Sequence, residues 1–214
     1  MKCIRRVLKW GLENDHVPSD PARDVKFVGN ATEGHHAWSH DEVEQFEARH
    51  PTGTKARLAL DLLLLTGLPR SDVVLLGRQH VRDGWIKLVL QKGKRRKPVT
   101  LELPVLPALQ TAIEAGPTGN MTFLVTQFGK PFTANGFGGW FRRRCNEAGL
   151  PQCSAHGLRK AAASVAAERG ATVHQLMALF GWMTMRQAET YTRQASRRQM
   201  AGDAAPLMVR EPKR

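Results

Sequence analysis

The chain has 214 residues, with 32 Lys and Arg against 19 Asp and Glu, so its formal net charge is +13 with histidine neutral. This length suits one substantial domain with a small appendage. Hydrophobic residues make up 42% and charged residues 24% of the chain, which excludes a disordered or collagen-like protein. The apolar runs, such as residues 62–65, are too short to cross a bilayer, so the sequence predicts a soluble protein with no membrane contact.

The surplus of positive charge indicates a polyanionic partner, because each phosphate that binds Lys or Arg releases condensed counterions. Nucleic acid is favoured over an anionic membrane surface, since no basic amphipathic helix with a broad apolar face is evident. The three cysteines are odd in number and lack C-x-x-C spacing, which argues against disulfides and a thiolate zinc site. Together with the lack of a secretion signal near Met1, this predicts a cytoplasmic protein.

The first half of the chain predicts four helices. Apolar residues at helical spacing predict one helix over residues 4–14, and a Pro-rich linker follows it. Ser39 and Glu42 form a capping box, so a second helix should begin there. A third helix is expected from about residue 54 to 65, ending at Gly67, as a later helix over residues 173–180 is expected to end at Gly181. Ser71-Asp72 is expected to cap a short fourth helix that ends near residue 76.

The period of the apolar residues then changes from that of a helix to that of a strand. Residues 80–103 predict three antiparallel strands, joined by an Asp83-Gly84 turn and by a basic turn at residues 92–97. Helical patterns return from Pro107, and the glycine-rich stretch at residues 135–139 is expected to interrupt them. The predicted class is α+β: a mostly helical domain with a small three-stranded antiparallel sheet.

Three histidines, His35, His36 and His40, lie close together before the second helix. No carboxylate or thiolate stands at ligand spacing from them along the chain, so they are interpreted as solvated loop residues. The sequence predicts no metal site.

Two basic clusters are candidates for binding DNA phosphates. The tip of the predicted hairpin carries five cations in six residues, and a later helix carries three in a row. The alternative in each case is an ordinary solvated surface. A hairpin tip can reach into a groove, which favours phosphate binding for the first cluster. The candidate DNA-binding residues are Lys94, Arg95, Arg96, Lys97, Arg142, Arg143 and Arg144.

The last third of the chain contains an ordered set of motifs. His156 and Arg159 form H-x-x-R, Gly181 is followed by Trp182, and Tyr191, the only tyrosine, comes nine residues after Trp182. In this order, and with a basic hairpin upstream, the set resembles the tyrosine recombinases of the phage integrase family. The resemblance extends from about residue 38 to residue 198.

The resemblance implies catalytic roles for several residues. Tyr191 would attack phosphorus to form a 3′-phosphotyrosine, and Arg159 would stabilise the charge on the non-bridging oxygens. His156 would assist proton transfer or donate to the phosphate, and the Trp182 indole N–H would supply a donor where many relatives use His. Lys92 would protonate the leaving 5′ oxygen, a role for which Lys94 competes. This chemistry needs no cofactor, and the implied partner is double-stranded DNA, bound by a homotetramer.

The first arginine motif departs from the family pattern T-G-x-R-x-x-[ED]. Thr66, Gly67 and Asp72 match it, which puts Pro69 where the first catalytic arginine belongs. Proline is tolerated just before a helix, so the fold should survive. Arg70 is adjacent, but one step along a helix turns a side chain by about 100°. By analogy with other phosphoryl-transfer arginines, the loss would slow the reaction by about 10³- to 10⁵-fold.

The sequence thus predicts three regions and leaves several functions open. Residues 1–30 are expected to be the remnant of an N-terminal DNA-clamping domain with its linker, 31–198 the catalytic domain, and 199–214 a C-terminal tail. The main function is DNA recombination or integration, in the manner of a prophage or other mobile element. The alternatives are an inactive DNA-binding remnant or accessory protein, a topoisomerase of the same chemistry, and a basic RNA-binding protein.

Overall fold

The computed structural model describes residues 2–25, 34–92, 94 and 97–205. The chain forms two compact units, residues 1–34 and 35–214, which are considered separately. The first contains the helix α1 (Lys2–Glu13), which agrees with the predicted helix at residues 4–14. Ile4 and Val7 on this helix are more than half exposed, at 55% and 66%.

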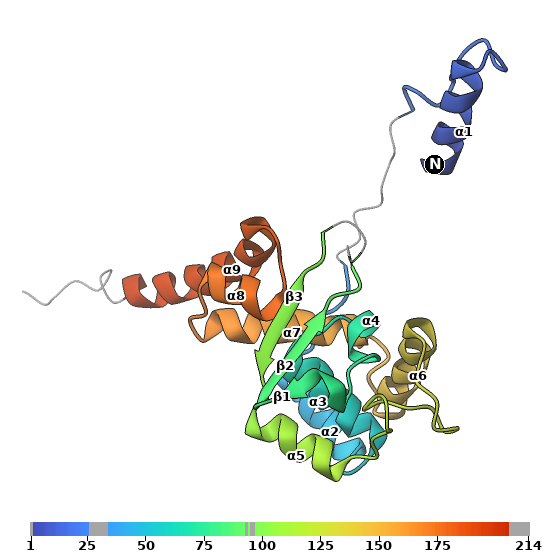
Figure 1. The fold of residues 1–214 in the computed structure, drawn as a ribbon. Helices are drawn as coiled ribbons and strands as arrows, with labels where there is room; N and C mark the ends of the chain where they lie inside the picture. The colour runs from blue at the N-terminus through green and yellow to red at the C-terminus, as the bar shows by residue number, and fades with distance from the viewer. Residues whose placement is uncertain (1, 26–33, 93, 95–96, 206–214) are drawn as a thin grey trace, which may run out of the picture. The chain divides into compact units, whose positions relative to one another are not determined.

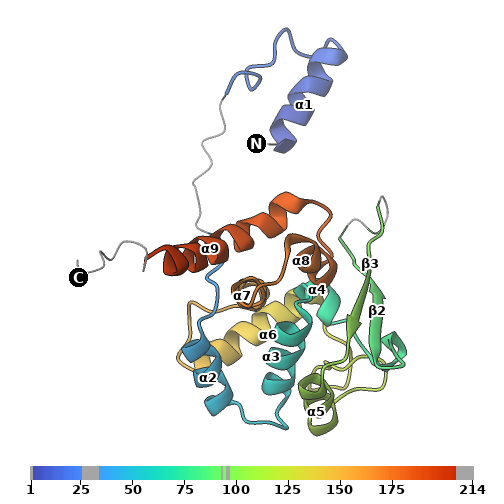
Figure 2. The ribbon, with the colours of Figure 1, turned by 90° about the vertical axis from the view of Figure 1, so that its left-hand side faces the viewer.

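The second unit is a helical domain with one small sheet (Figure 1). Strands β1 (Val81–Arg82), β2 (Trp85–Val89) and β3 (Thr100–Pro104) are antiparallel in the order β1-β2-β3, with Ile86 opposite Leu103. Figure 2 shows the sheet on one side of the helices, with α5 at its end. The helices of this unit are α2 (His40–Arg49), α3 (Lys55–Thr66), α4 (Arg70–Val73), α5 (Pro107–Ala115), α6 (Ala134–Glu147), α7 (Ala155–Glu168), α8 (Val173–Phe180) and α9 (Met185–Ala204). The predicted α+β class is confirmed.

Helix α3 lies at the centre of the core, because apolar residues lie on most sides of its surface. Leu58, Leu60, Leu62 and Leu63 are at most 1% exposed, and α3 packs against α5, α6 and α7. A helix that is apolar on all sides is stable only where neighbours cover every face. The central position of α3 therefore fixes where α7, which carries His156 and Arg159, can lie.

The predicted start of α2 at its capping box is confirmed, and so are the predicted ends of two helices at glycines. The Ser39 hydroxyl accepts from the Glu42 backbone N–H, and the Glu42 carboxylate accepts from that of Ser39. Gly67 ends α3 with φ 60°, and Gly181 ends α8 with φ 61°. Both adopt the left-handed conformation that glycine reaches without steric cost.

Two predicted boundaries are wrong. Helix α4 begins at Arg70 with Pro69 as its N-cap and ends at Val73, so Ser71 and Asp72 lie inside it rather than capping it. Proline's fixed φ suits this entry to a helix. The glycine-rich stretch does not interrupt a helix either: it forms the first turns of α6, because Thr133 caps that helix and Phe137 is fully buried. Packing outweighs the low helix propensity of glycine.

Within the described residues, no helix combines the length and the apolar character that a membrane crossing requires.

Candidate active site

Arg159 lies at the centre of the candidate site, on α7. Its guanidinium donates to the backbone carbonyls of Gly67 and Phe180, the second at 2.6 Å. Burial lowers its pKa to about 10, although the nearby Tyr191 and Asp72 oppose that shift. A guanidinium with this pKa is still charged at neutral pH. Arg159 has five N–H donors, and the two carbonyl contacts leave others for a phosphate oxygen.

An aromatic column connects Arg159 with Tyr191. The Arg159 guanidinium lies 5.2 Å from the centre of the Phe180 ring and 5.7 Å from that of Trp182. Phe180 stacks on Trp182 at 4.8 Å, and Trp182 stacks on Tyr191 at 5.3 Å with their planes 9° apart. Burial raises the pKa of Tyr191, and Arg159 partly offsets this. The phenol is therefore protonated at neutral pH and needs a base to become a nucleophile.

Asp72 attaches the hairpin to this site. Its side chain is almost fully buried, at 1% exposed, and accepts from the backbone N–H of Gln91 at 2.7 Å and from the Ser71 hydroxyl at 2.6 Å. On the other side of the hairpin base, Leu90 lies against Gly181, where an added Cβ would approach the Leu90 side chain to 2.6 Å. The chain segment that leads to Lys92 is thus held between α4 and the end of α8.

His156 lies on the exposed N-terminal turn of α7, one turn before Arg159. Its ring stacks on that of His35 at 4.5 Å, and the Lys160 ammonium donates to the His35 carbonyl at 2.7 Å. Burial lowers the pKa of His156, and the positive charges of His35, Arg70 and Arg159 lower it further. The imidazole is therefore neutral at pH 7 and has a nitrogen lone pair that can accept a proton.

Arg70 is directed toward α6. Its guanidinium donates to the Asn135 side chain at 3.2 Å and lies against Gly138, where an added Cβ would stand 2.5 Å from Nη1. Pro69 makes no side-chain capping hydrogen bond. The position of the family's first arginine therefore carries no charge, and the neighbouring arginine contacts a different helix.

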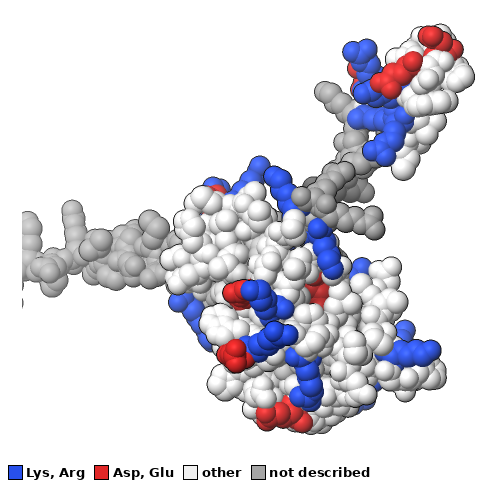
Figure 3. Space-filling model, viewed as in Figure 1, with Lys and Arg blue, Asp and Glu red and all other residues white. Residues whose placement is uncertain are grey.

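The basic residues predicted to bind DNA differ in their surroundings. Lys92, Lys94 and Lys97 are exposed on the hairpin, while Arg95 and Arg96 lie outside the described residues. On α6, Arg143 is exposed, whereas Arg142 donates to the Pro151 carbonyl and Arg144 pairs with Glu147 and lies over Trp140. Figure 3 shows Lys and Arg side chains near α6 and over the sheet. Over the sheet, acidic side chains lie among the basic ones.

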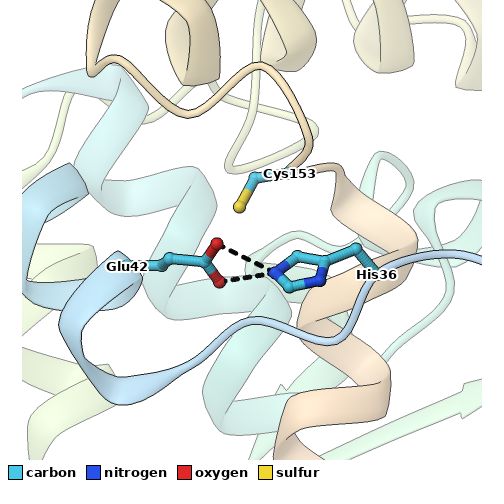
Figure 4. A group of neighbouring side chains, drawn as sticks. All are labelled: His36, Glu42 and Cys153. Atoms are coloured by element: carbon cyan, nitrogen blue, oxygen red, sulfur yellow. Dashed lines mark hydrogen bonds and ion pairs between the residues drawn. The ribbon is translucent and has the colours of Figure 1, made fainter.

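A cluster of His36, Glu42 and Cys153 lies apart from these residues (Figure 4). His36 Nε2 contacts both Glu42 carboxylate oxygens, at 2.8 and 2.7 Å. Gln152 and the Ser39 backbone N–H donate to the same carboxylate. Burial alone would raise the pKa of Glu42, but its hydrogen bonds lower it to about 2. Burial and the adjacent carboxylate raise the pKa of Cys153 to about 12.

The three histidines are exposed, as predicted, but two of them have partners that the sequence did not show. His36 has a carboxylate partner, and His35 stacks on the candidate catalytic His156. Cys153 is 117 positions from His36, so spacing along the chain does not bring the two together. The available signal was Glu42, whose place in a capping box fixes its carboxylate near the start of α2.

The comparisons with known proteins identify the family of the chain and its fold. The model of the phage integrase family matches residues 38–198, which is most of the chain. The chain belongs to the phage integrase family. Among curated proteins, no sequence matches it.

Several solved structures share the fold of this phage integrase domain. Lambda integrase (residues 75–356) bound to DNA has a TM-score of 0.72 and 17% identity, over 91% of this chain and 72% of that one. A lambda integrase tetramer bound to a Holliday junction has a TM-score of 0.71 and 15% identity, over 88% and 56%. XerH recombinase bound to its difH substrate has a TM-score of 0.61 and 17% identity, over 85% and 57%. The chain thus spans little more than half the length of two of these proteins.

In this phage integrase domain, four of the six predicted catalytic residues surround one region: His156, Arg159, Trp182 and Tyr191. Lys92 is exposed beyond the hairpin base, and Arg70 contacts α6. Sequence reasoning missed two contributors, the Phe180 ring and the Gly67 carbonyl, because both act on Arg159 through close packing.

The conformation of Gly67 leads to a test of this packing. In Gly67→Ala, an added Cβ would lie 2.9 Å from Phe180 Cδ1, at a residue whose φ is already positive. We expect the free energy of unfolding to fall by about 2 to 5 kcal/mol, from the left-handed backbone together with overpacking. Urea denaturation measures this change.

Gly170→Ala is the matched control, because Gly170 also has a positive φ, +91°, but open space around its Cβ position. It should cost only the backbone contribution, about 1 to 2 kcal/mol. Equal losses in the two variants would show that the Gly67 backbone does not press on Phe180.

Proposed function

We propose that this domain binds double-stranded DNA and that its site is built to cleave one strand by attack of Tyr191 on phosphorus. The observation that carries the proposal is the continuous stack from the Arg159 guanidinium through Trp182 to the Tyr191 ring. It places a buried cation and the only phenol of the chain beside one another, at the base of a basic hairpin. A growing negative charge on phosphate oxygens would be stabilised there.

The proposed reaction needs two proton transfers. The Tyr191 oxygen forms a bond to phosphorus while its proton passes to the neutral His156 imidazole. The bond from phosphorus to the 5′ oxygen breaks, and Lys92 supplies the proton that the leaving oxygen needs. Arg159 and the Trp182 indole N–H donate to the non-bridging oxygens. The product is a 3′-phosphotyrosyl link, and reversal by another 5′ hydroxyl would rejoin a strand.

A specific observation favours the second candidate function, a DNA-binding protein that does not cleave. Pro69 leaves the site with one buried arginine, and Arg70 is directed at Asn135 on α6. As the sequence stands, we therefore expect cleavage to be slow. The proposal that the domain cleaves DNA has two further parts. The N-terminal unit is the remnant of a clamping domain. Residues 199–214 form a tail that docks on a neighbouring subunit of a homotetramer.

A suicide duplex with a nick near the cleavage point tests the proposal, because loss of the short strand traps the covalent intermediate. We expect a protein–DNA adduct that forms slowly and is linked at Tyr191, as peptide mapping would show. Tyr191→Phe keeps the stacked ring and removes the attacking oxygen, so it should form none. An adduct on another residue, or one that persists in Tyr191→Phe, would refute the assignment of the nucleophile.

Binding to duplex DNA should depend steeply on salt concentration. Each phosphate contact contributes about −0.9 to the slope of log K against log salt concentration. We expect the triple variant Lys94→Gln, Arg95→Gln, Arg96→Gln to reduce the magnitude of that slope by about 2.7, because three proposed phosphate contacts are lost. Fluorescence anisotropy over a range of salt concentrations measures the slope.

A control of equal charge uses three cations that already pair with carboxylates. Lys9, Lys87 and Arg193 pair with acidic residues at 3.6, 2.5 and 2.8 Å. Changing all three to Gln lowers the net charge by the same three units as the hairpin variant. If both variants lose the same slope, the hairpin makes no direct contact with DNA and only the net charge matters.

A further inference from the structure

Three segments that are distant in the sequence meet at the cluster of His36, Glu42 and Cys153. His36 lies in the segment before α2, Glu42 in the first turn of α2, and Cys153 in the loop between α6 and α7. One imidazole nitrogen, one carboxylate oxygen and one sulfur lie within 4.8 Å of one another. Figure 4 shows the imidazole facing the carboxylate, with the sulfur beside them.

From this geometry we infer that His36, Glu42 and Cys153 bind a zinc ion. A tetrahedral zinc ion with bonds of about 2.0 to 2.3 Å separates its ligand atoms by about 3.3 to 3.6 Å. The His36 and Glu42 atoms would move slightly apart from their present 2.7 Å, and the sulfur would move in by about an ångström.

The ligand chemistry selects zinc over the hard cations. Calcium and magnesium prefer sets made of oxygen alone, whereas thiolate and imidazole suit zinc. One carboxylate and one thiolate balance the two charges of the ion, and the Cys153 thiol proton passes to solvent on binding. Cys153 is fully buried and His36 is exposed, so the fourth position faces water. Three protein ligands and one water form a common zinc arrangement.

The surroundings hold the carboxylate in a fixed orientation before any ion arrives. Gln152 donates to one Glu42 oxygen at 2.7 Å, and the Ser39 backbone N–H donates to the other at 2.8 Å. Such hydrogen bonds from neighbouring groups orient metal ligands and are usual around zinc sites. The ion would tie the segment before α2 to the start of α7, where His35 already stacks on His156. The ion would therefore fix the position of the segment whose His35 contacts His156.

Cobalt substitution tests the site, because a thiolate bound to Co²⁺ gives an intense near-ultraviolet absorption that other ligands do not give. The full chain, freed of metal by chelator dialysis, should develop this band to one equivalent of Co²⁺ and lose it on addition of Zn²⁺. Cys153→Ser should abolish the band. Cys3→Ser is the matched control, since Cys3 is an exposed thiol outside the cluster, and it should leave the band unchanged.

Thermal unfolding gives an independent result. Zn²⁺ should raise the melting temperature of the unaltered protein, because it binds the folded state. His36→Ala should weaken zinc binding at least tenfold, and His36 is exposed, so this variant remains informative if Cys153→Ser does not fold. A protein that shows neither the cobalt band nor a zinc-dependent shift would overturn the inference. A cobalt band that survives in both Cys153→Ser and His36→Ala would also overturn it. The test is independent of DNA cleavage.

Discussion

Pro69→Arg should raise the rate of covalent protein–DNA adduct formation by about 10³- to 10⁵-fold, the range that arginines contribute in other phosphoryl transfers. The new guanidinium would join Arg159 at the developing phosphate charge, because residue 69 lies two positions after the Gly67 carbonyl that Arg159 contacts. The backbone at residue 69 has φ −60° and ψ 152°, which any residue adopts. We therefore expect the free energy of unfolding to change by less than about 1 kcal/mol.

The same suicide duplex measures this effect, with the double variant Pro69→Arg, Tyr191→Phe as the blank. Two outcomes would contradict the account in different ways. Strong adduct formation by the unaltered chain, lost on Arg70→Ala, would show that Arg70 has taken the vacant role despite its contact with Asn135. No adduct from Pro69→Arg, with DNA binding intact, would place the limiting defect elsewhere in the chain.

Arg159→Lys, made in the Pro69→Arg protein, should lower adduct formation about 10³-fold. A single ammonium cannot reach the carbonyls of Gly67 and Phe180 together while also donating to a phosphate, and it lacks the planar face that stacks on Trp182. The charge is kept, so the salt dependence of DNA binding should not change. The rate of adduct formation and the binding slope separate the two effects.

Arg193→Lys is the matched control, because Arg193 is an exposed arginine on α9 that pairs with Glu189. It should leave the rate within about twofold, since a surface pair contributes little. A rate that is insensitive to Arg159→Lys would mean that charge alone matters at this position. The two carbonyl contacts would then serve the fold and not the reaction.

The parts of the fold that sequence predicted are those set by local chemistry. The capping box at Ser39, the left-handed glycines Gly67 and Gly181, and the alternation of apolar residues in β2 each act within a few residues. The order of the motifs from His156 to Tyr191 can also be found without a structure, because it depends only on residue types and their spacing. These features bring His156, Arg159, Trp182 and Tyr191 into one part of the domain.

The parts that sequence missed depend on contacts between distant segments. The glycine-rich start of α6 is helical because Phe137 is buried in the core and Arg70 approaches Gly138, neither of which shows in local propensity. Asp72 reads as a helix cap, yet it lies inside α4 and binds the backbone of Gln91. The cluster around Glu42 needs the loop before α7 to return to α2, which only the packed domain shows.

The identity of residue 69 bears on how such a domain can evolve. Its side chain contributes no capping hydrogen bond, so a change between proline and arginine there removes no hydrogen bond from the fold. The proline and arginine codons of the CCN and CGN sets differ by one base. A lineage could therefore lose its strand-cleaving chemistry and regain it by single mutations, while the rest of the site stays assembled around Arg159. The chemistry is in this sense a reversible genetic trait of an unchanged scaffold.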